Sequence, residues 1–235
     1  MKFVVSTHVF KKLESVCFGV VVARGIDNRF SNPKIAEFLQ ESIRSTEEKF
    51  ADGPVKESPA IIPYREAFTK LGINPNKFMC SIEALTTRIA KKKGFPEINA
   101  VVDLGNAIAL KYLLPLGAHD IGGLTEDIEV RFAGGEERFI PFGQEEAERP
   151  VPGELVYAVG NQVKTRLWIW RQSELGKVTE RSTAIFFPID GFTDVNLEAV
   201  IKARDELALN LQKHFGCSVS VGLVDRNKQE LDLSS

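Results

Sequence analysis

Hydrophobic and polar positions change their spacing along the chain, and these changes divide it into strand-like and helical stretches. Residues 15–26 (SVCFGVVVARGI) form a nearly continuous apolar run, which is typical of a strand covered on both faces. In residues 34–50 the apolar positions recur at helical spacing and predict an amphipathic helix. A shorter helix is predicted over residues 64–72, where Gly72 supplies the C-terminal stop.

Two more helices are predicted in the first half of the chain. Residues 81–94 open with Ser81 as the expected N-cap and close on three lysines and a glycine, which suits the helix dipole at both ends. Residues 98–114 are too long an apolar stretch for a strand, so we expect a helix despite the valines. Gly105 lies inside that helix and costs about 1 kcal/mol relative to alanine. We therefore expect it to permit the close approach of another group.

The spacing changes to strand-like alternation in the second half. Residues 127–143 predict a hairpin that turns at GGEE, and residues 154–170 predict a second hairpin that turns at GNQ. The remaining elements are a strand, a long amphipathic helix and a last alternating strand, over residues 177–190, 194–216 and 217–224. Helices therefore gather early and strands late, which predicts an α+β fold and not a doubly wound parallel sheet.

Composition narrows the classes of protein. The 235 residues carry a formal net charge of −2, so any contact with RNA has to come from a local basic patch. Cys17, Cys80 and Cys217 are far apart and outside metal-ligand spacing, which indicates reduced core residues. No signal peptide and no membrane-spanning run is recognisable. We expect a soluble, cytoplasmic protein without a membrane partner.

Several strong signatures of chemistry are missing from the sequence. No GxxxxGKS/T, GxGxxG, HExxH, GxSxG or paired CxxC pattern occurs. Sequence support is therefore absent for a phosphate-binding loop, a dinucleotide fold, a zincin, a hydrolase elbow and a zinc ribbon. We expect no cofactor and no metal.

His119 and the RLWIWRQSE stretch carry the most informative side chains. His119 precedes Asp120, and such a pair is either a base held in one tautomer or a turn that only fixes the chain. On an alternating strand, Arg166, Trp168 and Trp170 would share one face. That face would either stack a base and hold a phosphate or simply cover the end of a sheet.

Lys91, Lys92 and Lys93 form the basic run of the chain. A lysine run at the C-terminus of a helix is either a solvated helix end or a patch that binds phosphate. The sequence leaves both interpretations open.

Three stretches then occur in an order that points to a family. Residues 98–143 (INAVVDLGNAIALKYLLPLGAHDIGGLTEDIEVRFAGGEERFIPFG) are followed by residues 152–170 and 177–190. In this order they resemble the editing, or tRNA-binding, domain of the phenylalanyl-tRNA synthetase beta subunit, and more closely its free-standing relatives. The resemblance covers roughly residues 64–192.

The resemblance implies an α+β fold with a mixed or antiparallel sheet and packed helices. We expect a single domain over residues 1–235, with an N-terminal extension over 1–60, the editing-like core over 64–192 and a C-terminal helix and strand over 193–235. It also implies a cleft that binds the end of a tRNA or aminoacyl-tRNA and hydrolyses a mischarged amino acid in trans, without ligase activity.

For such a hydrolase we assign His119, Asn106 and Glu174 to the positioning of water. The implied substrate-binding residues are Asn99, Asp103, Gly105, Asp120, Trp168 and Arg171. Lys91, Lys92 and Lys93 would bind RNA. The chain departs from the family pattern at Gly105, Gly117 and Pro188; the last stands where the family has the glutamate that reads a tyrosine hydroxyl, and the nearest acid is Asp190. Two other functions stay open, namely an RNA-binding module without turnover and a protein that binds a free amino acid.

Overall fold

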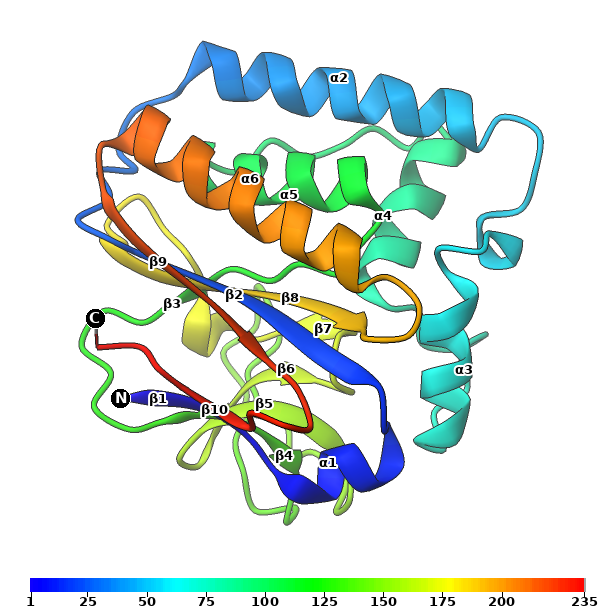
Figure 1. The fold of residues 1–235 in the computed structure, drawn as a ribbon, viewed down its shortest axis with the longest axis vertical. Coiled ribbons are helices and arrows are strands. Elements are labelled where there is room, and N and C mark those ends of the chain that lie inside the picture. The colour runs from blue at the N-terminus through cyan, green and yellow to red at the C-terminus, as the bar shows by residue number, and fades with distance from the viewer. Residues whose placement is uncertain (235) are drawn as a thin grey trace.

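Two β-sheets pack face to face, and a layer of helices covers the outer face of one of them (Figure 1). These features come from a computed structural model that describes residues 1–234. The fold is α+β with one antiparallel and one mixed sheet, as the segregation of helices and strands predicts.

The four-stranded sheet lies in the middle of the molecule, with strand order β3-β8-β2-β9 and antiparallel pairing throughout. Its central strand is β2 (Val16–Arg24), between β8 (Ala184–Phe192) and β9 (Ser218–Val224), and the short β3 (His119–Asp120) pairs with the other edge of β8. Nearly every residue of β2 and all of β8 are buried. The prediction of a strand covered on both faces is confirmed.

The six-stranded sheet has the order β10-β1-β4-β5-β6-β7, and only β1 and β4 pair in parallel. Its strands are β1 (Lys2–Val5), β4 (Ile128–Phe132), β5 (Leu155–Val159), β6 (Gln162–Arg166), β7 (Arg171–Gln172) and β10 (Glu230–Asp232). Residues 1–60 therefore supply one strand to each sheet, and β1 brings the two chain ends side by side.

Helices α2, α5 and α6 lie on the side of the four-stranded sheet that faces away from the six-stranded sheet, whereas α1 packs near β4 of the six-stranded sheet (Figure 1). The α-helices are α1 (Thr7–Lys12), α2 (Pro33–Lys49), α3 (Ile62–Lys70), α4 (Ser81–Ala90), α5 (Ala100–Tyr112) and α6 (Leu197–Phe215), and the short 3-10 helices are η1 (Val55–Glu57) and η2 (Glu174–Gly176). Helix α5 contacts both α2 and α6, and α6 lies on β2. The predicted long helices are confirmed, although α4 begins at Ser81 with Cys80 as its N-cap.

Alternation along β2 divides the core into two parts. Phe18 and Val20 point between the sheets, where they join Phe3 and Tyr157. Cys17 and Val21 point to the helices. The space between the sheets is thus built largely from aromatic side chains, and it also holds the buried polar residues described below.

Two strand predictions are wrong. The hairpin over residues 127–143 does not form, because both edges of β4 are taken by β1 and β5, while Phe139 fills a separate apolar cluster. The second hairpin forms as β5 and β6, but β6 ends at Arg166. Leu167 and Trp168 then adopt left-handed backbone angles, with φ of 46° and 62°. Trp168 is consequently turned inward and fully buried, so Arg166, Trp168 and Trp170 share no stacking face.

Candidate functional site

A cleft of about 490 Å³ opens beside helix α5. Val102, Gly105 and Asn106 of α5 form one wall, since positions three and four apart lie on the same side of a helix. The lining also includes Phe142, Gln172, Glu174, Lys177 and Val178. Most of the lining is apolar, so the cleft suits a small ligand with a hydrophobic part.

Two of the predicted catalytic residues, Asn106 and Glu174, line this cleft. Asn106 is half-buried, and its amide has no hydrogen-bond partner within residues 1–234. The Oε1 atom of Glu174 accepts hydrogen bonds from the Gly143 N–H at 2.8 Å and from Lys177 Nζ at 3.2 Å. The Gly143 N–H, assisted by Lys177, lowers the pKa of Glu174, so its carboxylate is ionised at neutral pH.

Gly105 lets a neighbouring segment approach α5 closely. A Cβ atom at this position would lie 3.3 Å from Cδ2 of Leu116, tighter than an ordinary contact. Leu116 lines the cleft and also a smaller cavity behind it. Gly105 therefore helps to place the residue that separates the two spaces.

The smaller cavity, of about 70 Å³, lies between the two sheets and is called the inner cavity below. It shares Leu116 and Gln172 with the cleft, so the two spaces are neighbours. Its walls include His119, Tyr157, Thr165, Trp168, Pro188 and Asp190. His119 thus lines this cavity and not the cleft that holds Asn106 and Glu174.

Asp190 is a buried carboxyl group without a cationic partner. Its Oδ1 atom accepts hydrogen bonds from Tyr157 Oη and Trp168 Nε1, both at 2.7 Å. Burial raises the pKa of Asp190 from 3.8 to about 7, although these two donors oppose the shift. Within residues 1–234, every side-chain N or O atom that is fully buried has a hydrogen-bond partner. Oδ2 of Asp190 has no partner within this range, so it is not one of these fully buried atoms. We conclude that Oδ2 is open to the inner cavity.

His119 is neutral in this environment. Burial, together with the positive charge of Lys164, lowers its pKa from 6.5 to about 3. Its ring lies 6.0 Å, centroid to centroid, from the nearly parallel ring of Tyr157. Nδ1 lies 3.3 Å from Gln172 Nε2. A histidine in this state does not exchange protons near neutral pH.

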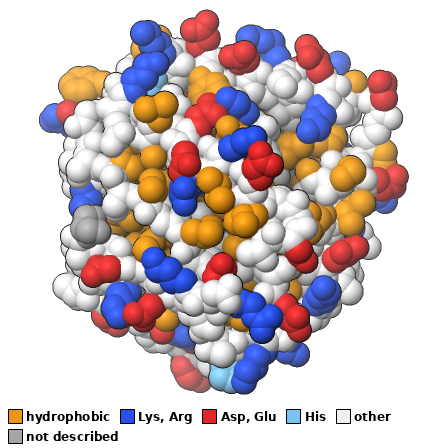
Figure 2. Space-filling model, viewed as in Figure 1, with side chains coloured by type: hydrophobic (Ala, Val, Ile, Leu, Met, Phe, Trp, Pro, Cys, Tyr) orange, Lys and Arg blue, Asp and Glu red, His pale blue; other side chains and the backbone are white. Residues whose placement is uncertain are grey.

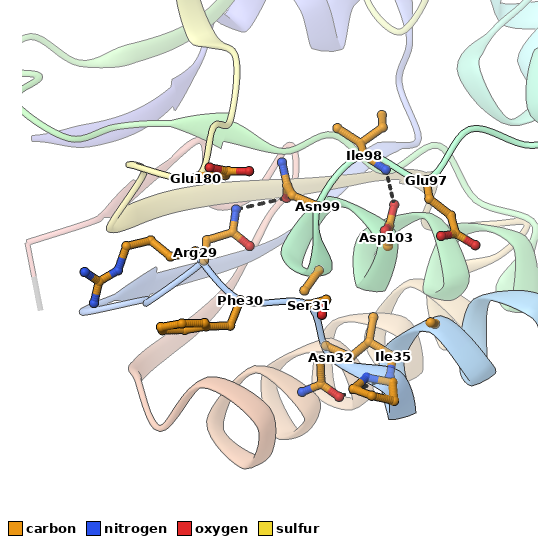
Figure 3. A pocket seen from close by; sticks show the side chains of 14 residues that line it. Arg29, Phe30, Ser31, Asn32, Ile35, Glu97, Ile98, Asn99, Asp103 and Glu180 are labelled. Carbon is orange, nitrogen blue, oxygen red and sulfur yellow. Dashed lines mark hydrogen bonds between the residues drawn. The ribbon is translucent and has the colours of Figure 1, made fainter.

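Asn99 and Asp103 face a different pocket, of about 430 Å³, at the N-termini of α2 and α5 (Figure 3). Asn99 caps α5 by accepting a hydrogen bond from the Val102 N–H at 3.1 Å, and it accepts another from Asn28 Nδ2 at 2.9 Å. Asp103 accepts one from the Ile98 N–H at 3.0 Å. Of the polar residues predicted on this helix, only Asn106 lines the cleft.

Asp120 and Arg171 lie outside the lining of both the cleft and the inner cavity. Asp120 accepts hydrogen bonds from the Gly122 N–H at 2.8 Å and from Ser182 Oγ at 2.5 Å. These bonds fix the turn after β3. The guanidinium group of Arg171 lies 5.9 Å from the ring centroid of Trp170.

Lys91, Lys92 and Lys93 are exposed at the end of α4. The segment that follows them contributes Phe95 and Pro96 to the cleft, whereas the three lysines are not part of its lining. Elsewhere, on the face of α6 and β9, acidic and basic side chains are mixed and no field of one sign extends across the surface (Figure 2).

Sequence reasoning missed Gln172 as a site residue and assigned no role to Asp190. Asp190 does carry a signal, because it is the one charged residue in the apolar strand AIFFPIDGF. Gln172 carries none, since an isolated glutamine on a short strand is ordinary. Its place depends on the turn at Leu167 and Trp168, which the alternating pattern does not reveal.

Comparison with known proteins identifies the family. A family model described as the B3/4 domain matches residues 63–215. The protein therefore belongs to the B3/4 domain family, a domain found in the beta subunit of phenylalanyl-tRNA synthetase. The resemblance stated from the motifs is confirmed.

A solved structure has the same fold. It is the crystal structure of an N-terminal fragment of the phenylalanyl-tRNA synthetase beta subunit from Pyrococcus horikoshii, with a TM-score of 0.51 and 12% sequence identity. The match covers 92% of this chain and 49% of that one, so the chain spans about half the length of the fragment. No curated protein matches the chain.

No helix among residues 1–234 is long and apolar enough to cross a membrane. Within residues 1–234, no group of three or more His, Cys, Asp and Glu side chains is arranged to hold a metal ion.

Proposed function

We propose that this B3/4 domain binds the end of an aminoacyl-tRNA and hydrolyses the ester of a mischarged amino acid. The observation that carries the proposal is the cleft itself, whose largely apolar lining includes an ionised carboxylate, Glu174, and an amide without a hydrogen-bond partner among the described residues, Asn106. An aminoacyl ester is already activated, so positioning a water molecule and stabilising the developing charge are sufficient chemistry.

In the proposed reaction, the free oxygen of Glu174 holds a water molecule and accepts its proton as the water oxygen attacks the ester carbonyl. The amide N–H of Asn106 donates a hydrogen bond to the carbonyl oxygen, where negative charge develops. The carbon–oxygen ester bond then breaks, and the proton passes to the ribose oxygen of the tRNA. The amino acid leaves as a free carboxylate.

The inner cavity supports a role in reading the amino-acid side chain. In the resemblance, the glutamate that reads a tyrosine hydroxyl corresponds to Pro188. Asp190 is two residues further along β8, and alternation brings it to the same face of the strand. Its open Oδ2 atom suits a hydrogen-bond donor such as a hydroxyl at the end of the bound side chain.

Lys91, Lys92 and Lys93 support contact with the tRNA backbone, because they are exposed and the segment that follows them contributes Phe95 and Pro96 to the cleft. Such contacts release counterions, so affinity should fall steeply with salt. Replacing all three by serine should reduce the slope of affinity against salt by about two to three charges. Lys11→Ser/Lys12→Ser on α1 is the control, since α1 lies at the other end of the molecule (Figure 1). An unchanged slope in the triple variant would exclude these lysines.

The decisive test is deacylation of a panel of mischarged tRNAs by the purified protein. We expect hydrolysis above the spontaneous rate for at least one amino acid, and a loss of roughly 100-fold in Glu174→Gln. Glu145→Gln is the matched control, since Glu145 is exposed on a loop outside the cleft lining. Background rates with every amino acid, or an active Glu174→Gln variant, would overturn the proposal.

Binding without turnover is the second candidate. It is favoured by the ion pair of Glu174 with Lys177, which makes the carboxylate a weaker base. A thermal-shift screen with amino acids and aminoacyl-adenosine mimics separates the two functions, because a ligand at a hundred times its Kd adds about 2.7 kcal/mol of stability. Stabilisation by such mimics without any deacylation would establish a binding protein.

A further inference from the structure

We infer that Gln172 fixes His119 in the Nε2–H tautomer, so that the imidazole presents a hydrogen-bond donor to the inner cavity and does not act as a base. Gln172 is then a positioning residue. The tautomer is a property of the free protein, whereas the contribution of the donor to ligand recognition rests on the proposed function.

The orientation of the Gln172 amide is determined by its neighbours. Its Nε2 atom donates to the carbonyl oxygen of Ala118 at 2.6 Å. A carbonyl oxygen only accepts, so this end of the amide has to be the NH2 group. The carbonyl oxygen of Gly176 lies 3.4 Å from the same nitrogen and requires the same orientation.

This orientation determines which nitrogen of His119 carries the proton. The NH2 group of Gln172 lies 3.3 Å from Nδ1 of His119. A hydrogen on Nδ1 would point at another donor, and within residues 1–234 no oxygen accepts a hydrogen bond from Nδ1. Nδ1 is therefore the acceptor, and in a neutral imidazole the proton resides on Nε2.

The Nε2–H group is open to the inner cavity. Every fully buried side-chain N or O atom among the described residues has a hydrogen-bond partner. Nε2 of His119 has none in this part of the chain, so this atom is not fully buried. Gly117 keeps it uncovered, since a Cβ atom at 117 would lie only 3.1 Å from Nε2. The donor thus points into a space bounded by Tyr157 and Asp190.

The charged groups around the ring keep it neutral. Lys164 of β6 is buried, and its ammonium group donates to the carbonyl oxygen of Leu175 and to Gln162 Oε1, at 2.5 and 2.9 Å. Asp120 is directed away, to Gly122 and Ser182. Tyr157 and Asp190 bond to each other. A protonated imidazole would therefore lie beside a buried cation without an anionic partner.

A neutral donor selects the ligand group that enters the inner cavity. It favours an oxygen that accepts a hydrogen bond, such as a carbonyl or hydroxyl oxygen, and it disfavours an ammonium group, which has only donors. A change of pH between 5 and 8 would leave this selection at His119 unchanged, because the imidazole does not titrate there.

The first test uses 15N NMR of the histidine rings in the ligand-free protein. The chain has three histidines, so the His119 signals are assignable with a His119→Gln sample. We expect a protonated Nε2 and a bare Nδ1 from pH 8 to pH 5. In Gln172→Glu the new carboxylate accepts a hydrogen bond, so the imidazole hydrogen should move to Nδ1, while the exposed Gln144→Glu control keeps the wild-type pattern.

A titration of His119 between pH 5 and 7, or an Nδ1–H signal in the wild-type protein, would overturn the inference, even if Gln172→Glu failed to fold. These NMR signals do not depend on any activity. A negative deacylation assay would therefore overturn the proposed function without deciding the tautomer of His119.

The second test compares His119→Gln with His119→Phe in the deacylation assay. Glutamine keeps an N–H donor and removes the base, so its rate should stay within roughly 10-fold of wild type, whereas phenylalanine should lose roughly 100-fold. Equal losses in the two variants, with a pKa of 6 to 7 in the wild-type rate profile that disappears in His119→Gln, would show that His119 acts as a base and refute the donor role.

Discussion

Two pairs of polar residues, of which Asn28, His119 and Asp190 are buried and Asn99 is half-buried, differ in their hydrogen bonds. At the start of α5, Asn28 and Asn99 use every polar atom of their side chains, mostly on backbone groups of the helix end and of the 178–179 segment. Between the sheets, His119 and Asp190 each keep one polar atom open to the inner cavity. The first arrangement satisfies the unpaired N–H groups of a helix end, and the second leaves capacity for a ligand.

The comparison shows how structural and ligand-facing polar residues can be separated. Burial and residue type do not distinguish them, since Asn28 and Asp190 are both 2% exposed. The accounting of donors and acceptors does, because an unused buried polar atom costs free energy unless something else satisfies it.

The largest expected effect concerns the pH dependence of stability. The pKa of Asp190 is raised to about 7 in the fold, so its contribution to stability is complete below its unfolded pKa of 3.8 and is lost as pH rises through 7. The pKa of His119 is lowered to about 3, so its contribution is complete above 6.5 and is lost as pH falls. Each pKa shift corresponds to on the order of 4 kcal/mol in the free energy of unfolding. Between pH 4.5 and 6.5, a rise in pH lowers this free energy through Asp190 and raises it through His119.

Single variants should therefore reveal opposite slopes. Relative to wild type, His119→Gln should lose stability as pH rises, and Asp190→Asn should gain it, while the double variant should run parallel to wild type. Urea unfolding at pH 4.5, 5.5 and 6.5 measures this. If the free energy of unfolding changed with pH in the same way in all four proteins, the pKa values of His119 and Asp190 would not be shifted by burial in the inner cavity. The contrast with Asn28 and Asn99 would then fail.

An intermediate effect is expected at the helix end. Asn99→Ala removes the N-cap of α5 and leaves Asn28 without its partner, so it should lower the free energy of unfolding by about 2 kcal/mol at every pH. Ligand affinity measured at a temperature where the variant is folded should stay unchanged. A loss of affinity as large as that caused by Asp190→Asn would show that the helix end belongs to the binding site.

The smallest effect is expected at Gly105, between the two regions. Gly105→Ala gains up to about 1 kcal/mol of helix propensity, and its methyl group presses on the movable end of the Leu116 side chain. The net change in stability should stay below about 1 kcal/mol, while ligand affinity should fall a few-fold because the cleft narrows. Calorimetric unfolding and ligand titration on one sample measure both. A stability loss well above 1 kcal/mol would show that Leu116 is rigidly held.

Much of the fold follows from pattern. The sequence predicts β2, the helices α2, α5 and α6, and the β5–β6 hairpin. In each of these stretches the spacing of apolar residues fits either a helix or a strand, but not both. The hairpin after β4 is wrongly predicted because pattern does not reveal that β1, from the far end of the chain, occupies that edge. Trp168 is misplaced because its left-handed turn is stabilised by a hydrogen bond to Asp190, which is distant in sequence.

The sequence by itself determined the class of fold, the order of the elements and the family, because these depend on local period and on motifs read in order. It also determined that Asn106 and Glu174 were worth testing. Only the tertiary structure decided that Asn99 caps a helix while Asp190 faces a cavity, and that Gln172 orients His119. These roles depend on which hydrogen-bond donors and acceptors come into contact between the two packed sheets. Such contacts join residues that are distant in sequence, so they are set by tertiary packing and not by local pattern.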